Sequence, residues 1–414
     1  MVKNKLPNIL VLATTFPRWK NDSEPAFVFN LSKRLAKKGF KISVLVPGAP
    51  GALSYEEMGG LKIYRFTYFY PVSLQKLCYD GGALPNLKNS WLARVELPFF
   101  LLFQFLHIAW IIKKENIEMI HCHWIVPQGF FCAIYKKIFK IPLLLTAHAG
   151  DVFALNNYLI KLCARFTISE SDFCTANSKA TQKALKVICD KKNIEIIPMG
   201  VDLKDYNTKK YDSSLKEKHE IHGAFLLAVG RFVEKKGLKY LIDAMPMILS
   251  KKPDAKLHII GFGPEEKRLK THVIEKNLEN SVIFPGKKSP SELSKYFATA
   301  DILIGPSIVT KSGDTEGLGV VFLEAFASKT AVIASNVGGI PDIVIHGKTG
   351  LLVEQKNPQD IFEKVNCLLS DVALRNSLVV GGYTFVKNNF SWDVVQEKFA
   401  KIYNKTVHEN MSNI

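Results

Sequence analysis

Two glutamates in the last third of the chain have the spacing and surroundings of a ligand-binding element. Glu316 and Glu324 are eight positions apart and are separated by a Gly-Leu-Gly turn and an apolar run. Gly317 and Gly319 favour a tight turn whose backbone N–H groups can face a ligand. The residues from Gly319 to Ser328 predict a buried helix, apolar on all sides, with Glu324 in its middle. A buried carboxylate needs a partner, which the hydroxyls of a sugar would provide; a neighbouring lysine or backbone group is the alternative.

The first half of the chain places a histidine and an aspartate just after a predicted strand. Leu143–Ala147 is a short apolar run, and His148 and Asp151 follow it. Because ligands of open α/β sheets bind beyond the carboxyl ends of strands, both residues are candidates, and a structural histidine is the alternative. His121 and His123 are expected in another loop after a strand. Two histidines at this spacing can ligate a metal, but nothing nearby completes a set of three or four ligands.

The elements that position these residues alternate between strands and helices in both halves. The first unit has a strand at Ile9–Ala13, a helix at Ala26–Lys38 and a strand at Lys41–Val46, which indicates a parallel sheet. The apolar run at Ile9–Ala13 is too short for a signal peptide. Further strands are predicted at Leu61–Phe66, Ile117–His121, Phe173–Ala176, Ile194–Ile197, Phe225–Val229, Leu257–Ile260, Val282–Phe284, Ile302–Ile304, Ala331–Ala334 and Leu351–Val353. Helices are predicted at Gly129–Phe139, Lys179–Cys189, Gly237–Leu249, Pro358–Leu369 and Trp392–Tyr403.

Three segments depart from this rhythm. Thr67–Leu87 has no usable period and is expected to be irregular, and the lysine-rich Lys204–His222 is expected to connect two domains. Leu97–Ile112 is almost entirely apolar but falls short of the roughly 20 apolar residues of a spanning helix. It is expected to form a buried or partly membrane-facing helix.

Composition and charge narrow the functional classes. The 414 residues suffice for two domains, and the net charge is +17. Residues 1–200 hold 26 Lys and Arg against 13 Asp and Glu, whereas residues 201–414 hold 29 against 25. Such a one-sided excess favours an anionic partner, nucleic acid or an acidic membrane, unless it serves solubility alone. The seven cysteines include no C-x-x-C pair, which favours free thiols in a reducing compartment.

Taken together, four motifs in chain order resemble those of the family-4 retaining glycosyltransferases. They are Thr146–Asp151 (TAHAGD), Val229–Gly237 (VGRFVEKKG), Glu316–Glu324 (EGLGVVFLE) and the pair Gly338–Pro341 (GGIP) with Gly350–Val353 (GLLV). The opening Thr14–Pro17 and Ser23–Val28 are also similar to members that build exported polysaccharides. Each motif is modest alone, but their order and spacing are specific and cover essentially the whole chain.

The resemblance implies an α/β fold of two Rossmann-like domains facing a cleft, known as GT-B. The expected acceptor domain covers residues 1–203, with the C-terminal helix of about residues 391–414 packing back on it. The expected nucleotide-sugar domain covers residues 204–390. The acceptor would be a glycan or a polyprenyl-linked saccharide. No cofactor and no metal are expected, because the chain has no Asp-x-Asp pair to hold a metal-bound diphosphate.

The resemblance also implies a role for each candidate residue. Arg231 and Lys236 would hold the donor diphosphate, where cationic hydrogen bonds are strongest. Glu324 would bind the ribose hydroxyls and Glu316 the donor sugar, while His148 would contact that sugar near the reacting carbon. Asp151 is a weaker candidate for the same catalytic pocket. The remaining donor-binding candidates are Gly230, Gly317, Leu318 and Gly319, with Gly286 and Lys287 near the nucleobase. Many relatives carry a Gly-Gly loop after the first strand, which Thr14–Pro25 lacks.

The motifs leave rival functions to be weighed. A nucleotide-sugar epimerase of this fold would need no acceptor, and a phosphorylase would need a pyridoxal-phosphate lysine and usually a longer chain. A non-catalytic glycan- or nucleotide-binding homologue would not need Arg231, Lys236, Glu316 and Glu324 together. No nucleic-acid motif accompanies the scattered positive charge. We expect a cytoplasmic enzyme that associates peripherally with the anionic inner face of the cell membrane.

Overall fold

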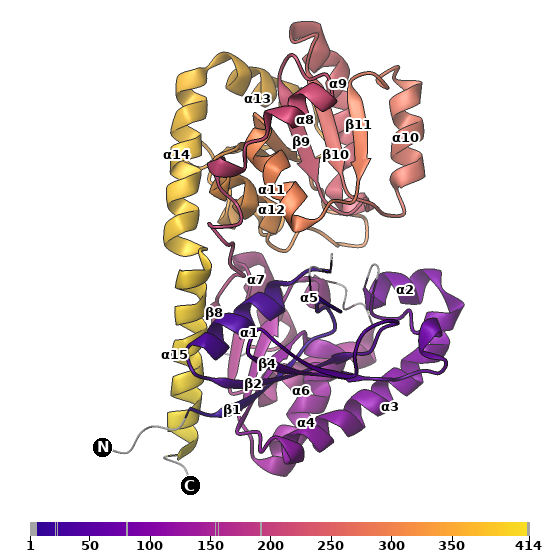
Figure 1. The fold of residues 1–414 in the computed structure, drawn as a ribbon, viewed down its shortest axis with the longest axis vertical. Coiled ribbons are helices and arrows are strands. Elements are labelled where there is room, and N and C mark those ends of the chain that lie inside the picture. The colour runs from indigo at the N-terminus through magenta and orange to yellow at the C-terminus, as the bar shows by residue number, and fades with distance from the viewer. Residues whose placement is uncertain are drawn as a thin grey trace. The chain divides into compact units, whose positions relative to one another are not determined.

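The chain forms two compact units. A computed structural model describes residues 6–20, 22, 24–79, 82–153, 155, 157–190 and 193–411. Unit 1 comprises residues 1–197 and 396–414, and unit 2 comprises residues 198–395 (Figure 1). Each unit contains one mainly parallel sheet with helices packed against it. Both are therefore Rossmann-like α/β units, which confirms the fold class expected from the sequence.

Unit 1 is built on an eight-stranded sheet of order β3-β4-β2-β1-β5-β6-β7-β8. All described neighbours are parallel except β3, which pairs antiparallel with β4. The strands are β1 (Asn8–Leu12), β2 (Lys41–Pro47), β3 (Tyr55–Met58), β4 (Leu61–Phe66), β5 (Met119–His123), β6 (Leu143–Ala147), β7 (Phe173–Ala176) and β8 (Ile194–Ile196). The central strands are buried apolar runs, as expected for a parallel sheet covered on both faces.

Helices and short turns connect these strands. They are α1 (Phe27–Lys37), η1 (Val72–Leu74), α2 (Ala83–Asn89), α3 (Trp91–Lys114), the π-turn η2 (Ile125–Gly129), α4 (Phe130–Phe139), α5 (Gly150–Phe153), α6 (Tyr158–Glu170) and α7 (Lys179–Ile188). Leu10 and Leu12 of β1 belong to the same core as the inner faces of α3, α4 and α6. Figure 1 shows α3 beside α4 at the outer side of this unit.

Unit 2 has a six-stranded parallel sheet of order β11-β10-β9-β12-β13-β14. Its strands are β9 (Phe225–Val229), β10 (Lys256–Ile260), β11 (Val282–Gly286), β12 (Ile302–Gly305), β13 (Ala331–Ser335) and β14 (Leu351–Val353). Its helices and turns are η3 (Thr208–Lys210), α8 (Ser213–Lys218), η4 (Glu234–Lys236), α9 (Leu238–Lys251), α10 (Glu266–Glu275), α11 (Pro290–Thr299), α12 (Val320–Ala327), η5 (Ile340–Asp342), α13 (Pro358–Ser370) and α14 (Val372–Asn389).

Alternation along the strands divides the interior of unit 2 into two cores. Leu226 and Ala228 of β9 pack with α9 and α13, whereas Phe225 and Leu227 pack with α11 and α12. The last helix, α15 (Trp392–Met411), begins in unit 2 and continues in unit 1. Within unit 1 it contributes Tyr403, whose ring makes an edge contact with Phe40.

Several local expectations were wrong. The segment Thr67–Leu87 is irregular over most of its described residues, as expected, but it includes η1 and the start of α2, whereas Lys204–His222 forms η3 and α8 as part of unit 2. The helices α6 and α14 were not predicted at all. Both His121 and His123 lie inside β5 rather than in the loop after it.

The helix α3 is longer than its apolar stretch indicated. Of the helices in the described residues, it alone is long and apolar enough to cross a membrane by length and composition, and a third of its most apolar window is buried. Such a helix is weak evidence for a span, because core helices of other proteins pass the same test.

Candidate functional site

The first part of the site is the short turn that follows β9. Gly230 and Arg231 come directly after the strand, and η4 leads into α9 through Gly237. Gly237 has a φ of +60°, and a Cβ atom there would lie 2.0 Å from the carbonyl oxygen of Pro306. The amide of Ile308 donates to the carbonyl of Lys235 at 2.8 Å. Only glycine therefore permits this close contact between the loops that follow β9 and β12.

Two lysines of η4 bind acidic residues of the loop before α12. Lys236 Nζ forms an ion pair with Glu316 Oε2, and both side chains are largely shielded from solvent. Lys235 Nζ lies 3.0 Å from Asp314 Oδ1 and donates to the carbonyl of Thr315 at 3.3 Å. The structure thus brings together Lys236 and Glu316, which the sequence places 80 positions apart.

The electrostatics of Glu316 follow from this pairing. Burial by itself raises the pKa of the Glu316 carboxyl. The charge and hydrogen bond of Lys236, the charge of Lys235 and a hydrogen bond from the Gly317 amide outweigh that effect and hold the pKa below its ordinary value. Glu316 is therefore an anion at neutral pH. An ionised carboxylate accepts hydrogen bonds strongly, which suits the hydroxyl groups of a sugar.

The Gly-Gly-Ile-Pro loop packs on the backbone of Glu316. Gly339 donates its amide to the Glu316 carbonyl at 3.0 Å. Gly338 has a φ of +55°, and a Cβ atom there would lie 2.1 Å from the same carbonyl oxygen. Two motifs that are separate in the sequence are therefore in contact at the Glu316 carbonyl.

Glu324 lies in the middle of α12. The residue before this helix, Gly319, has a left-handed backbone conformation. Leu318 is buried beside this turn and anchors it to the core. The expected helix is confirmed, but the partner of Glu324 was missed. Tyr206 donates its hydroxyl to Glu324, while burial raises the pKa of the carboxyl to about 7. Tyr206 lies in the lysine-rich segment Lys204–His222, and nothing in the sequence marked it as the partner of Glu324.

A small hollow lies at the carboxyl ends of β9 and β12. Its lining includes Val229, Gly230, Lys236, Gly305 and Ser307. The helix α9, which follows β9, and the helix α12, which follows β12, pack on opposite faces of the sheet, so the hollow lies at the topological switch point of unit 2. Open α/β sheets bind their ligands at such points.

Gly286 and Lys287 lie further along the same edge of the sheet. Gly286 ends β11 and accepts a hydrogen bond from the Gly261 amide at 3.3 Å. The ammonium of Lys287 is 4.7 Å from the centre of the Phe262 ring. β10 separates both residues from β9, so they are placed beside the switch point rather than within it.

In unit 1 the predicted histidine lies in an aromatic setting. His148 Nε2 is 2.9 Å from Nδ1 of His123, and the two rings stack with their centres 5.1 Å apart. The rings of Phe27 and Trp124 each lie 5.0 Å from the His148 ring. Burial lowers the pKa of His148 to about 3, so the imidazole is neutral at physiological pH. The neutral imidazole can donate one hydrogen bond and accept another, but it carries no charge.

Asp151 fixes the loop that carries His148. Its Oδ1 accepts from the His148 amide and its Oδ2 from the Ile125 amide, both at 2.9 Å. Burial raises the pKa of this carboxyl to about 6, against the opposing effect of these amide hydrogen bonds. Both oxygens bind backbone groups, so the contacts favour a positioning role for Asp151 over a direct one in the pocket.

A chain of polar side chains lies beneath His123 and was not predicted. His121 Nδ1 is 2.7 Å from the Tyr403 hydroxyl, and His121 Nε2 is 2.8 Å from the Thr146 hydroxyl. The hydroxyl oxygen of Thr146 lies 2.7 Å from the hydroxyl oxygen of Thr175, within hydrogen-bonding distance. Tyr403 belongs to α15, so no local pattern in the sequence indicated this contact. Among the residues that the structure describes, no group of three or more His, Cys, Asp or Glu side chains could hold a metal.

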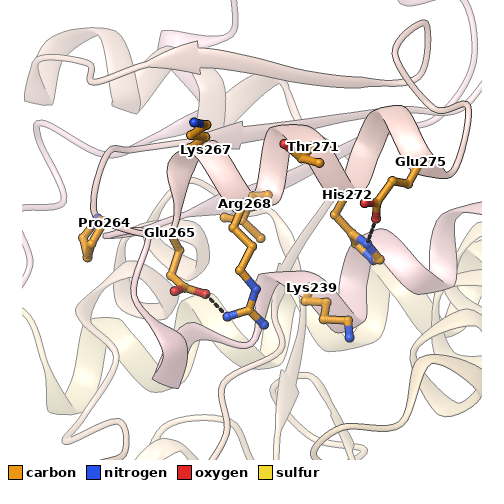
Figure 2. A pocket seen from close by; sticks show the side chains of 9 residues that line it. Lys239, Pro264, Glu265, Lys267, Arg268, Thr271, His272 and Glu275 are labelled. Carbon is orange, nitrogen blue, oxygen red and sulfur yellow. Dashed lines mark hydrogen bonds and ion pairs between the residues drawn. The ribbon is translucent and has the colours of Figure 1, made fainter.

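A second hollow of unit 2 lies between α9 and α10 (Figure 2). Four of its side chains pair with one another. Arg268 Nη1 lies 2.9 Å from Glu265, and His272 Nδ1 lies 3.5 Å from Glu275. Lys239 also lines this hollow. None of the predicted site residues lies here, and the pairing of its charges leaves the switch point as the better site.

The seven cysteines are all free thiols.

Comparison with known proteins assigns the family. Residues 26–205 match the family described as Glycosyltransferase Family 4, and residues 212–385 match Glycosyl transferases group 1. An uncharacterized glycosyltransferase of Methanocaldococcus jannaschii is 34% identical over 373 residues, which cover 87% of this chain and 98% of that protein. A GDP-mannose-dependent monoacylated alpha-(1-6)-phosphatidylinositol monomannoside mannosyltransferase of Corynebacterium glutamicum is 31% identical, over 71% of this chain and 78% of that one.

The fold agrees with solved structures. Sucrose-phosphate synthase of Thermosynechococcus elongatus aligns with a TM-score of 0.80 at 22% identity, over 96% of this chain and 98% of that one. Both family matches and the similarity of the first relative extend over the two units. The chain belongs to the family-4 glycosyltransferases, has their GT-B fold, and is a glycosyltransferase.

Proposed function

We propose that this glycosyltransferase moves a hexose-type sugar from a nucleotide-diphosphate sugar to a glycan or polyprenyl-linked saccharide. The ion pair of Lys236 and Glu316 at the switch point of unit 2 is the observation that carries this proposal. It places a cation and an anion where a charged, hydroxyl-rich ligand would meet both. The relative from Corynebacterium glutamicum supports the substrate class, because its name specifies a GDP-mannose donor and a lipid-linked sugar acceptor.

Different residues of unit 2 bind different parts of the nucleotide-sugar donor. Arg231 and Lys236 bind the diphosphate and stabilise its charge as it departs. The ammonium of Lys236 has three N–H donors, so it can bind a phosphate oxygen while it still contacts Glu316. Glu316 and the backbone amides around Gly317–Gly319 bind the sugar, and Glu324 binds the ribose hydroxyls. The positions of Gly230 after β9, of Gly286 at the end of β11 and of Lys287 directly after it support their assignment to the donor as well.

The reaction proposed here retains the anomeric configuration and uses no metal. The bond between the anomeric carbon and the diphosphate oxygen breaks while the acceptor hydroxyl attacks the same face. The hydroxyl proton passes to the departing diphosphate. Arg231, Lys236 and backbone amides replace the charge that a metal supplies elsewhere. His148 contacts the donor sugar, a role that rests on the family resemblance, and its neutral imidazole acts there as a hydrogen-bonding group.

Nucleotide release with and without added acceptor tests this function. We expect release to rise when a glycan or polyprenyl-linked saccharide is added, and nuclear magnetic resonance to show an unchanged anomeric configuration in the product. An epimerase would instead convert the donor without any acceptor. His148→Ala and Glu316→Ala should lose turnover, and Arg231→Ala should lose donor affinity and turnover together. Near-normal activity in all three variants would contradict the site assignment.

A further inference from the structure

The outer face of α3 is a continuous apolar stripe. Six residues form it at helical spacing, and each is between 44% and 74% exposed: Trp91, Val95, Phe99, Leu102, Leu106 and Trp110. At 1.5 Å per residue the stripe is about 28 Å long. Contiguous exposed apolar surface of this kind marks an interaction site, because scattered apolar residues do not align along one face.

The inner face of the same helix is part of unit 1. Phe100, Ile108 and Ile111 are buried in the core of that unit. Glu96, the one acidic residue of the helix, is buried and accepts hydrogen bonds from the amides of Lys76 at 3.1 Å and Leu77 at 2.9 Å. A helix that spanned a membrane would have to leave this core and carry Glu96 into lipid. The stripe therefore meets its partner while α3 stays packed on the sheet.

Basic residues lie at both ends of the stripe. Arg94 is exposed near the N-terminal end, and Lys113 and Lys114 are exposed at the C-terminal end. The ammonium of Lys114 lies 4.4 Å from the centre of the Trp110 ring. Since Glu96 is buried, no acidic side chain of α3 offsets these charges at the surface. An anionic surface complements this arrangement, with apolar side chains in the acyl region and cations at the headgroups.

A second copy of the chain fits the stripe less well. In a two-fold dimer, antiparallel packing of α3 would bring Arg94 against Lys113 and Lys114 of the partner copy. Parallel packing would bring the two lysine pairs together instead. Either arrangement opposes like charges, whereas anionic phospholipid neutralises them. The two tryptophans at the ends of the stripe also suit a membrane interface, where their rings lie at headgroup level.

From this complementarity we propose that the outer stripe of α3 docks unit 1 onto an anionic phospholipid bilayer, with the helix axis parallel to the membrane plane. This goes beyond the proposed function, because docking requires neither donor nor acceptor. It also gives the excess of 13 positive charges in the first 200 residues a physical role in peripheral attachment at the inner face of the cell membrane.

Co-sedimentation of the full chain with vesicles tests the proposal. The vesicles are phosphatidylcholine alone or phosphatidylcholine mixed with phosphatidylglycerol. We expect the wild type to sediment with the mixed vesicles at low salt and to be released by high salt. Leu102→Glu/Leu106→Glu should reduce the partition coefficient about tenfold or more, because it carries two charges into the interface. Lys113→Gln/Lys114→Gln should lose most of the preference for phosphatidylglycerol.

The matched control is Ile274→Glu/Val380→Glu, which adds the same charge at exposed apolar residues of unit 2. It should sediment like the wild type, and circular dichroism should show native folding of all variants. Four results would overturn the proposal: no sedimentation of the wild type, equal sedimentation of both Glu variants, resistance of the bound wild type to alkaline carbonate extraction, or a stripe-dependent dimer that does not bind vesicles. Loss of glycosyl transfer would leave these vesicle measurements unchanged, so the two proposals fail separately.

Discussion

Lys236 and Glu316 follow different strands of unit 2 and meet in an ion pair whose side chains are 18% and 14% exposed. Gly237 permits the approach of the two loops, Gly338 leaves room for the carbonyl of Glu316, and Gly339 donates its amide to that carbonyl. The pair therefore depends on a glycine of the motif that contains Lys236 and on the Gly-Gly-Ile-Pro loop. Three of the four motifs therefore meet at this pair, since each supplies either a ligand-binding group or the backbone contact that positions one.

Replacing Glu316 with glutamine should separate binding from turnover. Glu316→Gln keeps the shape of the side chain but removes the anion that competes for Lys236. We expect the affinity for the nucleoside diphosphate to stay the same or increase, while turnover falls about 100-fold because the donor sugar loses its charged acceptor of hydrogen bonds. Calorimetric titration and steady-state kinetics measure the two quantities. Parallel losses of affinity and turnover would contradict this division of roles.

The two lysines of η4 should behave differently. Lys236→Met should weaken nucleoside diphosphate binding about tenfold, because a charge-assisted hydrogen bond to phosphate is lost. Lys235→Met is the matched control, since Lys235 binds Asp314 and the Thr315 carbonyl. Its affinity should stay within about twofold of the wild type. The assignment of Lys236 is wrong if the two variants bind the nucleotide equally.

Nucleotide affinity should depend on the ionisation of Glu324. Its pKa is raised to about 7, mainly by burial, and the ionised form is the better acceptor for ribose hydroxyls. Affinity should therefore increase as the pH rises through about 7 and decrease below it. Glu324→Gln removes the titrating group and should give a flat profile. Calorimetry at about pH 6 and about pH 8 measures both, and an unchanged slope in the variant would refute the assignment.

The same shift has a consequence for stability. The folded-state pKa of Glu324 lies above the ordinary value for glutamate, so folding takes up a proton between the two values. The contribution of this group to stability is full below the ordinary pKa and is lost as the pH rises through about 7. Glu324→Gln should therefore unfold at a higher temperature relative to the wild type at about pH 8 than at about pH 5.

Alanine substitutions at two glycines with similar φ values should distinguish the cost of backbone strain from the cost of a steric clash. Gly338 and Gly347 have φ values of +55° and +71°, but a Cβ atom at Gly347 meets nothing within 4 Å. Gly347→Ala should cost about 1 kcal/mol in the free energy of unfolding. Gly338→Ala should cost more and should also lower turnover, because the Glu316 backbone must move. Chemical denaturation and kinetics measure these effects, and equal stability of the variants would rule out the clash.

Activity should not follow the titration of His148. Burial lowers its pKa to about 3, so the imidazole stays neutral across the usual assay range. His148→Ala should lower turnover about 100-fold without changing the shape of the pH profile between about pH 6 and about pH 8. The exposed His222 is the control, and His222→Ala should match the wild type. A flattened acidic limb in His148→Ala would show that His148 acts as a charged group.

The strands, and the positions of the candidate site residues relative to them, could be predicted because their signals are local. A parallel strand buried on both faces is a short apolar run, and glycine or a polar residue follows it. Arg231, His148 and Gly286 were found in this way. Their contacts are not local, however. The pairing of Lys236 with Glu316 and the bond between Tyr403 and His121 depend on how distant loops and helices pack.

The missed elements have physical explanations as well. The helix α14 contains Gly381 and Gly382, which in sequence favour a loop. In the structure both are required by close packing, since a Cβ at Gly381 would lie 2.1 Å from the Lys348 carbonyl oxygen and one at Gly382 would lie 2.4 Å from the Phe326 ring. The predicted strand ended at His121, where a loop containing His123 was expected to begin. Both histidines belong to β5, and Tyr403 and Thr146 satisfy both ring nitrogens of His121.

The most direct test of the central claim is nucleoside diphosphate release from a panel of UDP-, GDP- and ADP-sugars, measured with a chelator present. We predict that the wild type releases the nucleotide from one class of donor without metal, and that Arg231→Ala and Glu316→Ala do not. Release that requires a divalent cation, or equal release by both variants, would contradict a metal-free donor site at the switch point of unit 2.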